Sequence, residues 1–212
     1  MATRPMVMRR GAGILAAIGL VALGLQFVLL IQGDGALSFG EVIIRYFSNF
    51  TILTSLFAAV SLIAFAIKVG QDEWLVHPFV RTAIAVYSAL VFLVYLGALR
   101  ELWAPQGARW LADTVLHYVV PAGYVVFWLT CVRKAGLRWY DPLLWLIYPL
   151  IYVTVILIRG MISGFYPYPF IDAGHLGYAA IAANTAGLVA ACAAIGFLFV
   201  AAGWSLGRRQ KH

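Results

Sequence analysis

Charged residues are scarce in this chain, and their scarcity excludes most classes of soluble protein. Asp, Glu, Lys and Arg make up 11% of the 212 residues, hydrophobic residues make up 64%, and the mean hydropathy is +0.92. A soluble domain normally carries about 25% charged residues. The composition therefore predicts an integral membrane protein.

Cysteine is also rare, with two residues in the whole chain. Cys131 and Cys192 both lie in apolar stretches, so we expect ordinary small apolar side chains and no disulfide. We also expect no bound cofactor.

The chain contains six long apolar runs. They cover residues 11–31, 46–67, 79–99, 112–132, 141–159 and 177–204. Each run is near the length of about 20 residues that an α-helix needs to cross a bilayer. The connecting segments are short and leave no room for a soluble domain. We therefore predict an all-α fold, with residues 1–212 forming a single transmembrane domain of six helices in one bundle.

The distribution of Lys and Arg predicts the orientation of these helices. Four basic residues fall on one side of the predicted bundle: Arg45, Arg100, Arg109 and Arg159. Eleven fall on the other side: Arg4, Arg9, Arg10, Lys68, Arg81, Arg133, Lys134, Arg138, Arg208, Arg209 and Lys211. Because basic residues accumulate in cytoplasmic loops, both termini are predicted to be cytoplasmic. The net charge of +7 is then a topology signal and an attraction to anionic lipids, and it requires no nucleic-acid partner.

Hydroxyl side chains gather at the start of the second apolar run, in the segment RYFSNFTILTS. On one continuous helix, Ser48, Thr51, Thr54 and Ser55 would form a polar stripe. Such hydroxyls commonly bond to a carbonyl of their own helix or join neighbouring helices. The stripe therefore predicts either a packing contact or a functional site.

An acidic residue and a histidine lie one turn apart in the fourth apolar run. Asp113 and His117 share a helix face at i and i+4. Ionisable groups at membrane depth are costly and usually mark a site. Further polar residues of the same outer half are Arg159, Asp172, His175 and Asn184. Arg159 could equally reach for the outer interface, and Asp172 and His175 could belong to a plain turn.

A hydroxyl and a histidine at similar depth are two parts of a nucleophilic acyl-transfer site. Inside a membrane, a lipid ester would suit such a site, because its apolar chains can enter sideways while the ester stays at headgroup depth. We therefore predict lipid-ester hydrolysis, with Asp113 or Arg159 supporting the histidine or the developing oxyanion.

Three other functions remain open. Asp113, His117, Asp172 and His175 could together bind a hydrolytic zinc ion. The same outward site could bind lipid without catalysis. A small transporter is a further alternative, although the polar groups gather on one side and leave no pathway through the inner half. A bis-histidine haem site is disfavoured because His117 lacks a membrane-embedded histidine partner at matching depth.

Three segments resemble the androgen-induced protein family of six-span membrane proteins and its bacterial relatives. They are R-Y-F-S-N-F-T-I-L-T in the second run, D-T-x-x-H-x-x-x-P in the fourth, and R-G-x-x-x-G-x-Y-P-Y-P-F-I-D after the fifth. The resemblance implies an intramembrane threonine hydrolase that cleaves fatty acid esters of hydroxy fatty acids. It also implies a bacterial inner-membrane location, with lipid substrate and membrane lipids as partners.

The same resemblance implies that His117 is the family histidine and that a hydroxyl of the second run is the nucleophile. Aligning the basic and aromatic lead-in places Ser48 at that position, whereas aligning the Phe-Thr pair places Thr51 there. We favour Thr51, because it keeps the residue type and lies about one turn deeper, nearer the expected level of His117.

Overall fold

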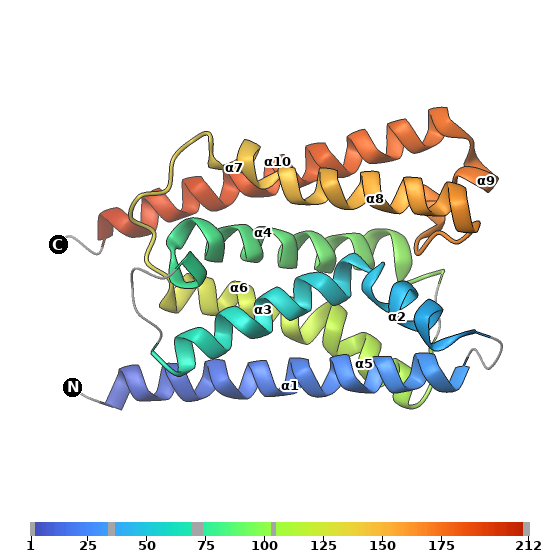
Figure 1. Ribbon diagram of the computed structural model, residues 1–212. Helices are drawn as coiled ribbons and strands as arrows, with labels where there is room; N and C mark the ends of the chain where they lie inside the picture. Colours follow the sequence, from blue (N-terminus) through green and yellow to red (C-terminus); the bar gives the residue numbers. More distant parts are fainter. Residues whose placement is uncertain (1–2, 34–36, 69–73, 103–104, 210–212) are drawn as a thin grey trace.

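The computed structural model describes residues 3–33, 37–68, 74–102 and 105–209, and these residues form helices and connecting turns without a strand. The elements are α1 (Thr3–Gly33), α2 (Phe39–Phe47), α3 (Phe50–Ala66), η1 (Trp74–Val76), α4 (Pro78–Val94), η2 (Tyr95–Leu99), α5 (Ala108–Thr114), η3 (Val115–Val119), α6 (Val120–Cys131), α7 (Asp141–Trp145), α8 (Ile147–Ser163), η4 (Pro169–Ile171), α9 (Ala173–Leu176) and α10 (Tyr178–Arg209). The predicted all-α fold is confirmed (Figure 1).

Five helical segments are long and apolar enough to cross a membrane. They are Pro5–Gly33, Pro78–Leu99, Ala108–Cys131, Asp141–Ser163 and Tyr178–Gly207, and the bent pair α2 and α3 supplies a sixth if it counts as one span. Large apolar side chains on their outer faces are exposed, among them Val21 (71%), Ile162 (82%) and Leu198 (68%). A surface of this kind is what a lipid-facing bundle requires.

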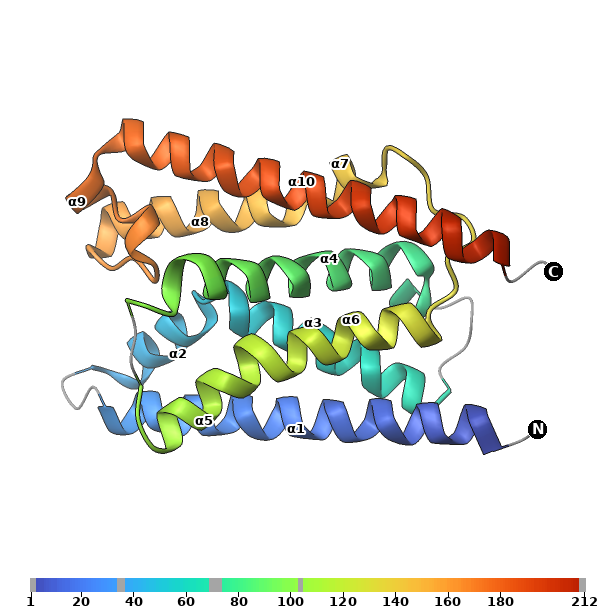
Figure 2. The ribbon, with the colours of Figure 1, turned by 180° about the vertical axis from the view of Figure 1, so that it is seen from behind.

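The helices form one bundle in which α4 is central. Figures 1 and 2 show α1, α3 and α6 on one side of α4 and the pair α8 and α10 on the other. The start of α1 and the end of α10 lie at the same end of the bundle. We call the opposite end, which carries α2, α5 and α9, the α2 end. The membrane side that each end faces stays a prediction, and Lys211 of the charge count lies outside the described residues.

Buried polar atoms join the helices inside this bundle. The hydroxyl of Tyr124 donates to Ser61 Oγ at 2.7 Å, and Trp128 Nε1 donates to Thr82 Oγ1 at 2.9 Å. The Tyr87 hydroxyl donates to the Trp145 carbonyl at 2.7 Å and so links α4 to α7. In an apolar medium an unpaired polar atom is costly, so these bonds specify how the helices pack.

The second predicted span, 46–67, is wrong as a single helix. Helix α2 ends at Phe47, α3 begins at Phe50, and the two are bent by 74°. Asn49 is extended at φ −90° and ψ 123°, and its side chain donates to the carbonyl of Arg45 at 3.0 Å, which also accepts from the Ser48 amide. The predicted stripe is therefore divided, because Ser48 caps α2 whereas Thr51 and Thr54 belong to α3.

The fifth predicted run also differs in its boundaries. The segment consists of α7 and α8, and α8 continues past Arg159 to Ser163. It stops at Gly164, whose φ of 69° is readily adopted by glycine but strained for other residues. Arg159 thus lies in the last turns of a helix, with its side chain beside α2.

Candidate functional site

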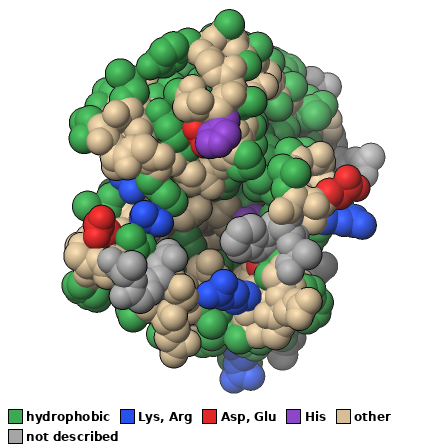
Figure 3. Space-filling model, turned by 90° about the vertical axis from the view of Figure 1, so that its right-hand side faces the viewer, with side chains coloured by type: hydrophobic (Ala, Val, Ile, Leu, Met, Phe, Trp, Pro, Cys, Tyr) green, Lys and Arg blue, Asp and Glu red, His purple; other side chains and the backbone are tan. Residues whose placement is uncertain are grey.

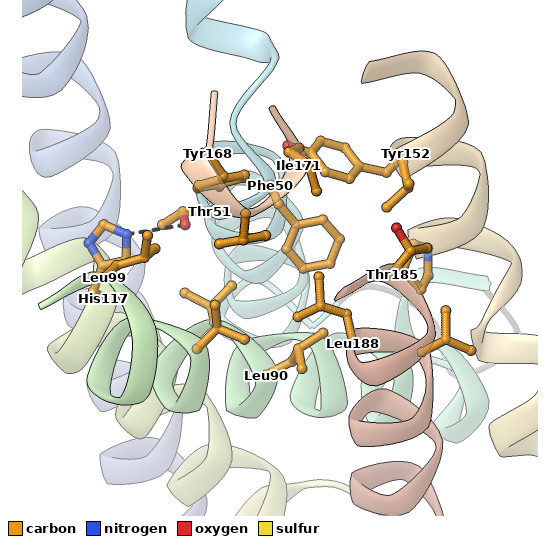
Figure 4. Close-up of a pocket in the computed structure, with 16 residues that line it drawn as sticks. Phe50, Thr51, Leu90, Leu99, His117, Tyr152, Tyr168, Ile171, Thr185 and Leu188 are labelled. Atoms are coloured by element: carbon orange, nitrogen blue, oxygen red, sulfur yellow. Dashed lines mark hydrogen bonds between the residues drawn. The ribbon is translucent and has the colours of Figure 1, made fainter. Parts of the chain in front are cut away.

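Thr51 and His117 come from different helices and meet inside the bundle. Thr51 lies in the first turn of α3, just after the bend, and His117 lies in η3. The distance from Thr51 Oγ1 to His117 Nε2 is 3.2 Å (Figure 4). Thr51 is 6% exposed and the His117 side chain 15%, so the contact is largely shielded from water.

Asp113 sets the orientation of the His117 ring. His117 Nδ1 is 3.0 Å from the Asp113 carbonyl oxygen and 3.1 Å from its carboxylate Oδ1. Carbonyl and carboxylate oxygens accept hydrogen bonds, so the network assigns the ring proton of the neutral histidine to Nδ1. Nε2 is then the acceptor that faces the Thr51 hydroxyl.

Tyr95 contacts both His117 and Asp113. Its ring stacks on the His117 ring, with centroids 4.1 Å apart and planes at 21°, and its hydroxyl donates to Asp113 Oδ2. Tyr95 opens the π-helical turn η2, and His117 lies in the π-helical turn η3. Wider turns of this kind re-aim side chains and are frequent at functional sites.

Two cavities meet at the Thr51–His117 pair. The outer cavity has a volume of about 410 Å³, is lined by polar and apolar residues that include Arg45, Asn49 and Asp113, and lies toward the α2 end. Figure 3 shows that face hollowed at its centre, with histidine atoms inside the hollow. The size is typical of a small-molecule pocket.

The second cavity is smaller and almost wholly apolar. Its volume is about 70 Å³, and it lies between α3, α4, α8 and α10 (Figure 4). Its lining residues are Phe50, Thr51, Leu90, Val91, Val94, Leu99, His117, Pro149, Tyr152, Val153, Tyr168, Phe170, Ile171, Thr185, Leu188 and Val189. Thr51, Leu99, His117 and Tyr168 line both cavities, so the pair lies where a polar space joins an apolar one.

The segment between α8 and α9 covers this junction. Burial raises the pKa of the Tyr168 hydroxyl, and hydrogen bonds with the Thr51 side chain and with the backbone of Thr51 and Phe50 oppose that shift. Tyr168 therefore stays protonated beside the first amides of α3. Asn184 Nδ2 donates to the Phe170 carbonyl at 2.8 Å and anchors the segment to α10.

Ser48 and Arg159 lie away from His117. The Ser48 hydroxyl donates to the Ile44 carbonyl and accepts from Arg159 Nη1, and neither residue lines the two cavities. The bend causes this separation, because it rotates α2 away from α3 just before Thr51. Of the two hydroxyls considered for the nucleophile, Thr51 is the one that contacts His117.

Three further residues of the predicted site also lie outside it. Thr54 is buried in α3 beside the Tyr148 hydroxyl and lines neither cavity. Asp172 caps α9 by accepting from the Gly174 amide at 3.0 Å. His175 pairs with Asp172 at 3.0 Å, and its side chain is 86% exposed.

The zinc alternative requires Asp113, His117, Asp172 and His175 to converge. The structure holds them as two separate pairs, and no group of three metal-ligating side chains occurs among the residues it describes. The ligand set that motivated a zinc site is therefore not assembled in the described ranges.

Two tyrosines of the site escaped the sequence analysis. Tyr95 and Tyr168 contact His117 and Thr51, yet tyrosines are common at membrane interfaces and carry little signal of their own. A usable signal for Tyr168 was its position in the Y-P-Y-P-F run, where two prolines restrict the backbone.

Comparisons of this chain with protein-family models, curated proteins and solved structures gave no match. The resemblance to the androgen-induced protein family stays a prediction that rests on the three sequence segments.

Proposed function

We propose that this protein is an intramembrane hydrolase of lipid esters, with Thr51 as nucleophile and His117 as general base. The observation that carries the proposal is the 3.2 Å contact between Thr51 Oγ1 and His117 Nε2, with Asp113 behind the imidazole. A hydroxyl, a base and a group that orients the base are the parts of an activated nucleophile.

In the acylation step, Thr51 Oγ attacks the ester carbonyl carbon while its proton passes to His117 Nε2. The carbon–oxygen bond to the alcohol portion then breaks, and the proton moves from Nε2 to the leaving oxygen. Asp113 stabilises the imidazolium that exists between these transfers. The products of this step are a free alcohol and an ester of Thr51.

In the second step a water molecule takes the place of the alcohol. His117 Nε2 accepts a proton from the water, and the water oxygen attacks the carbonyl carbon. The bond to Thr51 Oγ then breaks, the proton passes from Nε2 to Thr51 Oγ, and a carboxylic acid leaves. The negative oxygen of each tetrahedral intermediate needs donors. The first amides of α3 and the protonated Tyr168 hydroxyl lie beside Thr51 and are suited to that task.

The two cavities support a substrate with unlike ends. The first carbons of an acyl chain would enter the apolar cavity beside Leu90 and Leu188, and the polar portion would lie in the outer cavity, which would place the ester at the junction. Fatty acid esters of hydroxy fatty acids have this character. With the termini in the cytoplasm, the site would open to the outer side of a bacterial inner membrane.

A fluorophosphonate probe tests the proposal directly, since it reacts with activated serine and threonine hydroxyls. We expect labelling of the detergent-purified protein, complete loss in Thr51→Ala and His117→Ala, and retained labelling in Ser48→Ala. Hydrolysis of a fatty acid ester of a hydroxy fatty acid should follow the same order.

The almost wholly apolar lining of the smaller cavity favours lipid binding without catalysis as a second candidate function. Absence of labelling and of turnover in folded wild-type protein would contradict the hydrolase and leave this candidate.

A further inference from the structure

A separate groove lies on the outside of the bundle between α2 and α8. Its volume is about 450 Å³, and it is lined by Glu41, Ile44, Arg45, Val155, Ile158, Arg159, Ile162, Ser163 and Phe165. Thr51 and His117 do not line it, whereas Arg45 and Phe165 line both this groove and the outer cavity. The proposed hydrolase function makes no use of Arg159.

Two guanidinium groups converge on one aromatic ring in this groove. The Arg45 guanidinium carbon lies 4.4 Å from the centroid of the Phe165 ring, and that of Arg159 lies 5.0 Å from the same centroid. Arg159 also donates to the buried Ser48 hydroxyl. An arginine that only extended toward water would need neither contact. Ser48 and Phe165 instead hold Arg159 at the groove.

The carboxylate in this groove is already engaged. Glu41 Oε2 accepts from the Ser38 amide at 2.9 Å and from the Ser38 hydroxyl at 2.8 Å, as part of the capping box that begins α2. Within the described ranges, Arg159 makes no ion pair. Among the described residues, no carboxylate therefore balances the charge of Arg159.

The remaining wall of the groove is apolar and faces outward. Ile44 is 51% exposed, Val155 and Ile158 are each 54% exposed, and Ile162 is 82% exposed. The α8 members are spaced by three and four residues, so they form a stripe along the helix. Val155 and Ile158 lie on the side of Arg159 that is farther from the α2 end. A cationic pocket at the top of an apolar stripe matches a phosphate attached to an acyl chain.

We propose that this groove binds an anionic phospholipid, with its phosphate at Arg159 and one acyl chain along Ile158 and Val155. Arginine favours phosphate because its planar guanidinium donates two parallel hydrogen bonds. The bound lipid is not the hydrolase substrate, since its headgroup lies at Arg159 and away from Thr51. It would instead brace α2 against α8, beside the bend that positions Thr51.

Lipid binding to the detergent-purified full chain, measured by native mass spectrometry, tests this assignment. The probes are phosphatidylglycerol and phosphatidylcholine with the same acyl chains. We expect phosphatidylglycerol to bind the wild type at least tenfold more tightly than phosphatidylcholine. Because a charged hydrogen-bonded contact is lost, Arg159→Gln should weaken phosphatidylglycerol binding by about tenfold or more. Arg159→Lys should fall between the two.

The matched control is Arg109→Gln, which removes the same charge from an exposed residue at the same end of the molecule. It should bind phosphatidylglycerol as the wild type does. Equal binding of the two lipids, or equal losses in Arg109→Gln and Arg159→Gln, would overturn the proposal. Displacement of phosphatidylglycerol by millimolar inorganic phosphate would show a site for a free anion and overturn the lipid assignment. None of these measurements depends on ester hydrolysis, so they test the lipid site independently of the hydrolase proposal.

Discussion

His117 has a partner for each ring nitrogen, and that arrangement accounts for an imidazole inside an apolar bundle. Nδ1 faces two oxygens of Asp113, and Nε2 faces the Thr51 hydroxyl. A neutral imidazole has one donor and one acceptor nitrogen, and inside an apolar bundle both need a partner. Contacts on both sides hold the ring in one tautomer and aim its basic nitrogen at a hydroxyl.

The first prediction concerns the two reacting residues. Thr51→Val and His117→Gln should each lower kcat for ester hydrolysis by about 10³-fold or more, because the nucleophile or its base is removed. Thr54→Val is the matched control, since it makes the same change in a buried threonine of α3 that lines neither cavity. Equal losses in Thr51→Val and Thr54→Val would point to a packing role for both.

The second prediction concerns Tyr95 as a positioning residue. Tyr95→Phe keeps the ring that stacks on His117 and removes the hydroxyl that donates to Asp113. We expect kcat to fall by about tenfold with KM unchanged, because a hydrogen bond to a charged group is worth about 1.5–3 kcal/mol. Steady-state kinetics measures kcat and KM separately.

Tyr118→Phe is the control for Tyr95→Phe. Its ring packs edge-on against Tyr95, and its hydroxyl makes no hydrogen bond within the described ranges. Wild-type kinetics in Tyr95→Phe would exclude the positioning role.

At the scale of elements, the bend between α2 and α3 decides the chemistry. It ends one helix at Phe47 and begins the next at Phe50, which brings the first turn of α3 to the cavity junction, with amides that have no partner inside the helix. A straight helix would satisfy these amides internally. The bend therefore places Thr51 and potential oxyanion donors at one point.

The third prediction concerns the segment that covers the junction. Gly160 of α8 lies under Tyr166, and a Cβ added there would lie 2.0 Å from Tyr166 Cε1. Gly160→Ala should therefore push the 164–172 segment away from Thr51 and lower the free energy of unfolding by about 1–3 kcal/mol. Thermal unfolding and turnover in detergent measure both effects.

Gly187→Ala in α10 is the control for the glycine substitution. A Cβ at that position has no neighbour within 4 Å, so alanine should leave stability unchanged or raise it by about 0.5–1 kcal/mol. Equal stability of the two variants would show that the Tyr166 ring moves aside without consequence.

At the scale of the whole molecule, the two ends of the bundle differ in chemistry. The α2 end carries the outer cavity, the groove between α2 and α8, and the Asp172–His175 pair. The other end carries the start of α1, the end of α10 and most of the basic residues. A single assignment of orientation therefore decides which side of the membrane supplies water to the site.

The fourth prediction tests that orientation. In a background of Cys131→Ala and Cys192→Ala, Gln106→Cys at the α2 end should react with a membrane-impermeant maleimide in intact cells. Ala135→Cys, exposed at the opposite end, should react only after permeabilisation, because the basic side is expected to be cytoplasmic. The reverse labelling pattern would place the site on the cytoplasmic side.

Much of the fold and part of the candidate site were predictable from hydropathy and from the few polar residues in the apolar runs, because both signals are local in the sequence. The long apolar runs predicted the membrane-competent helices, and the spacing of Asp113 and His117 predicted their shared face. The bend at Asn49 and the π-helical turns at Tyr95 and His117 were not predictable from local composition. Contacts between distant parts of the chain accompany them, such as the Tyr152 hydroxyl on the Ser48 carbonyl and the Thr51–His117 contact.

The sequence by itself determined an all-α chain with apolar helices of membrane-spanning length and a histidine among them that needed a partner. The tertiary structure decided which hydroxyl that partner is. Thr51 and Ser48 are three residues apart and chemically alike, and only the bend and the packing of α3 against η3 bring Thr51 to His117 while Ser48 pairs with Arg159. Helix rotation and bending depend on contacts between segments distant in sequence, so no local pattern encodes them.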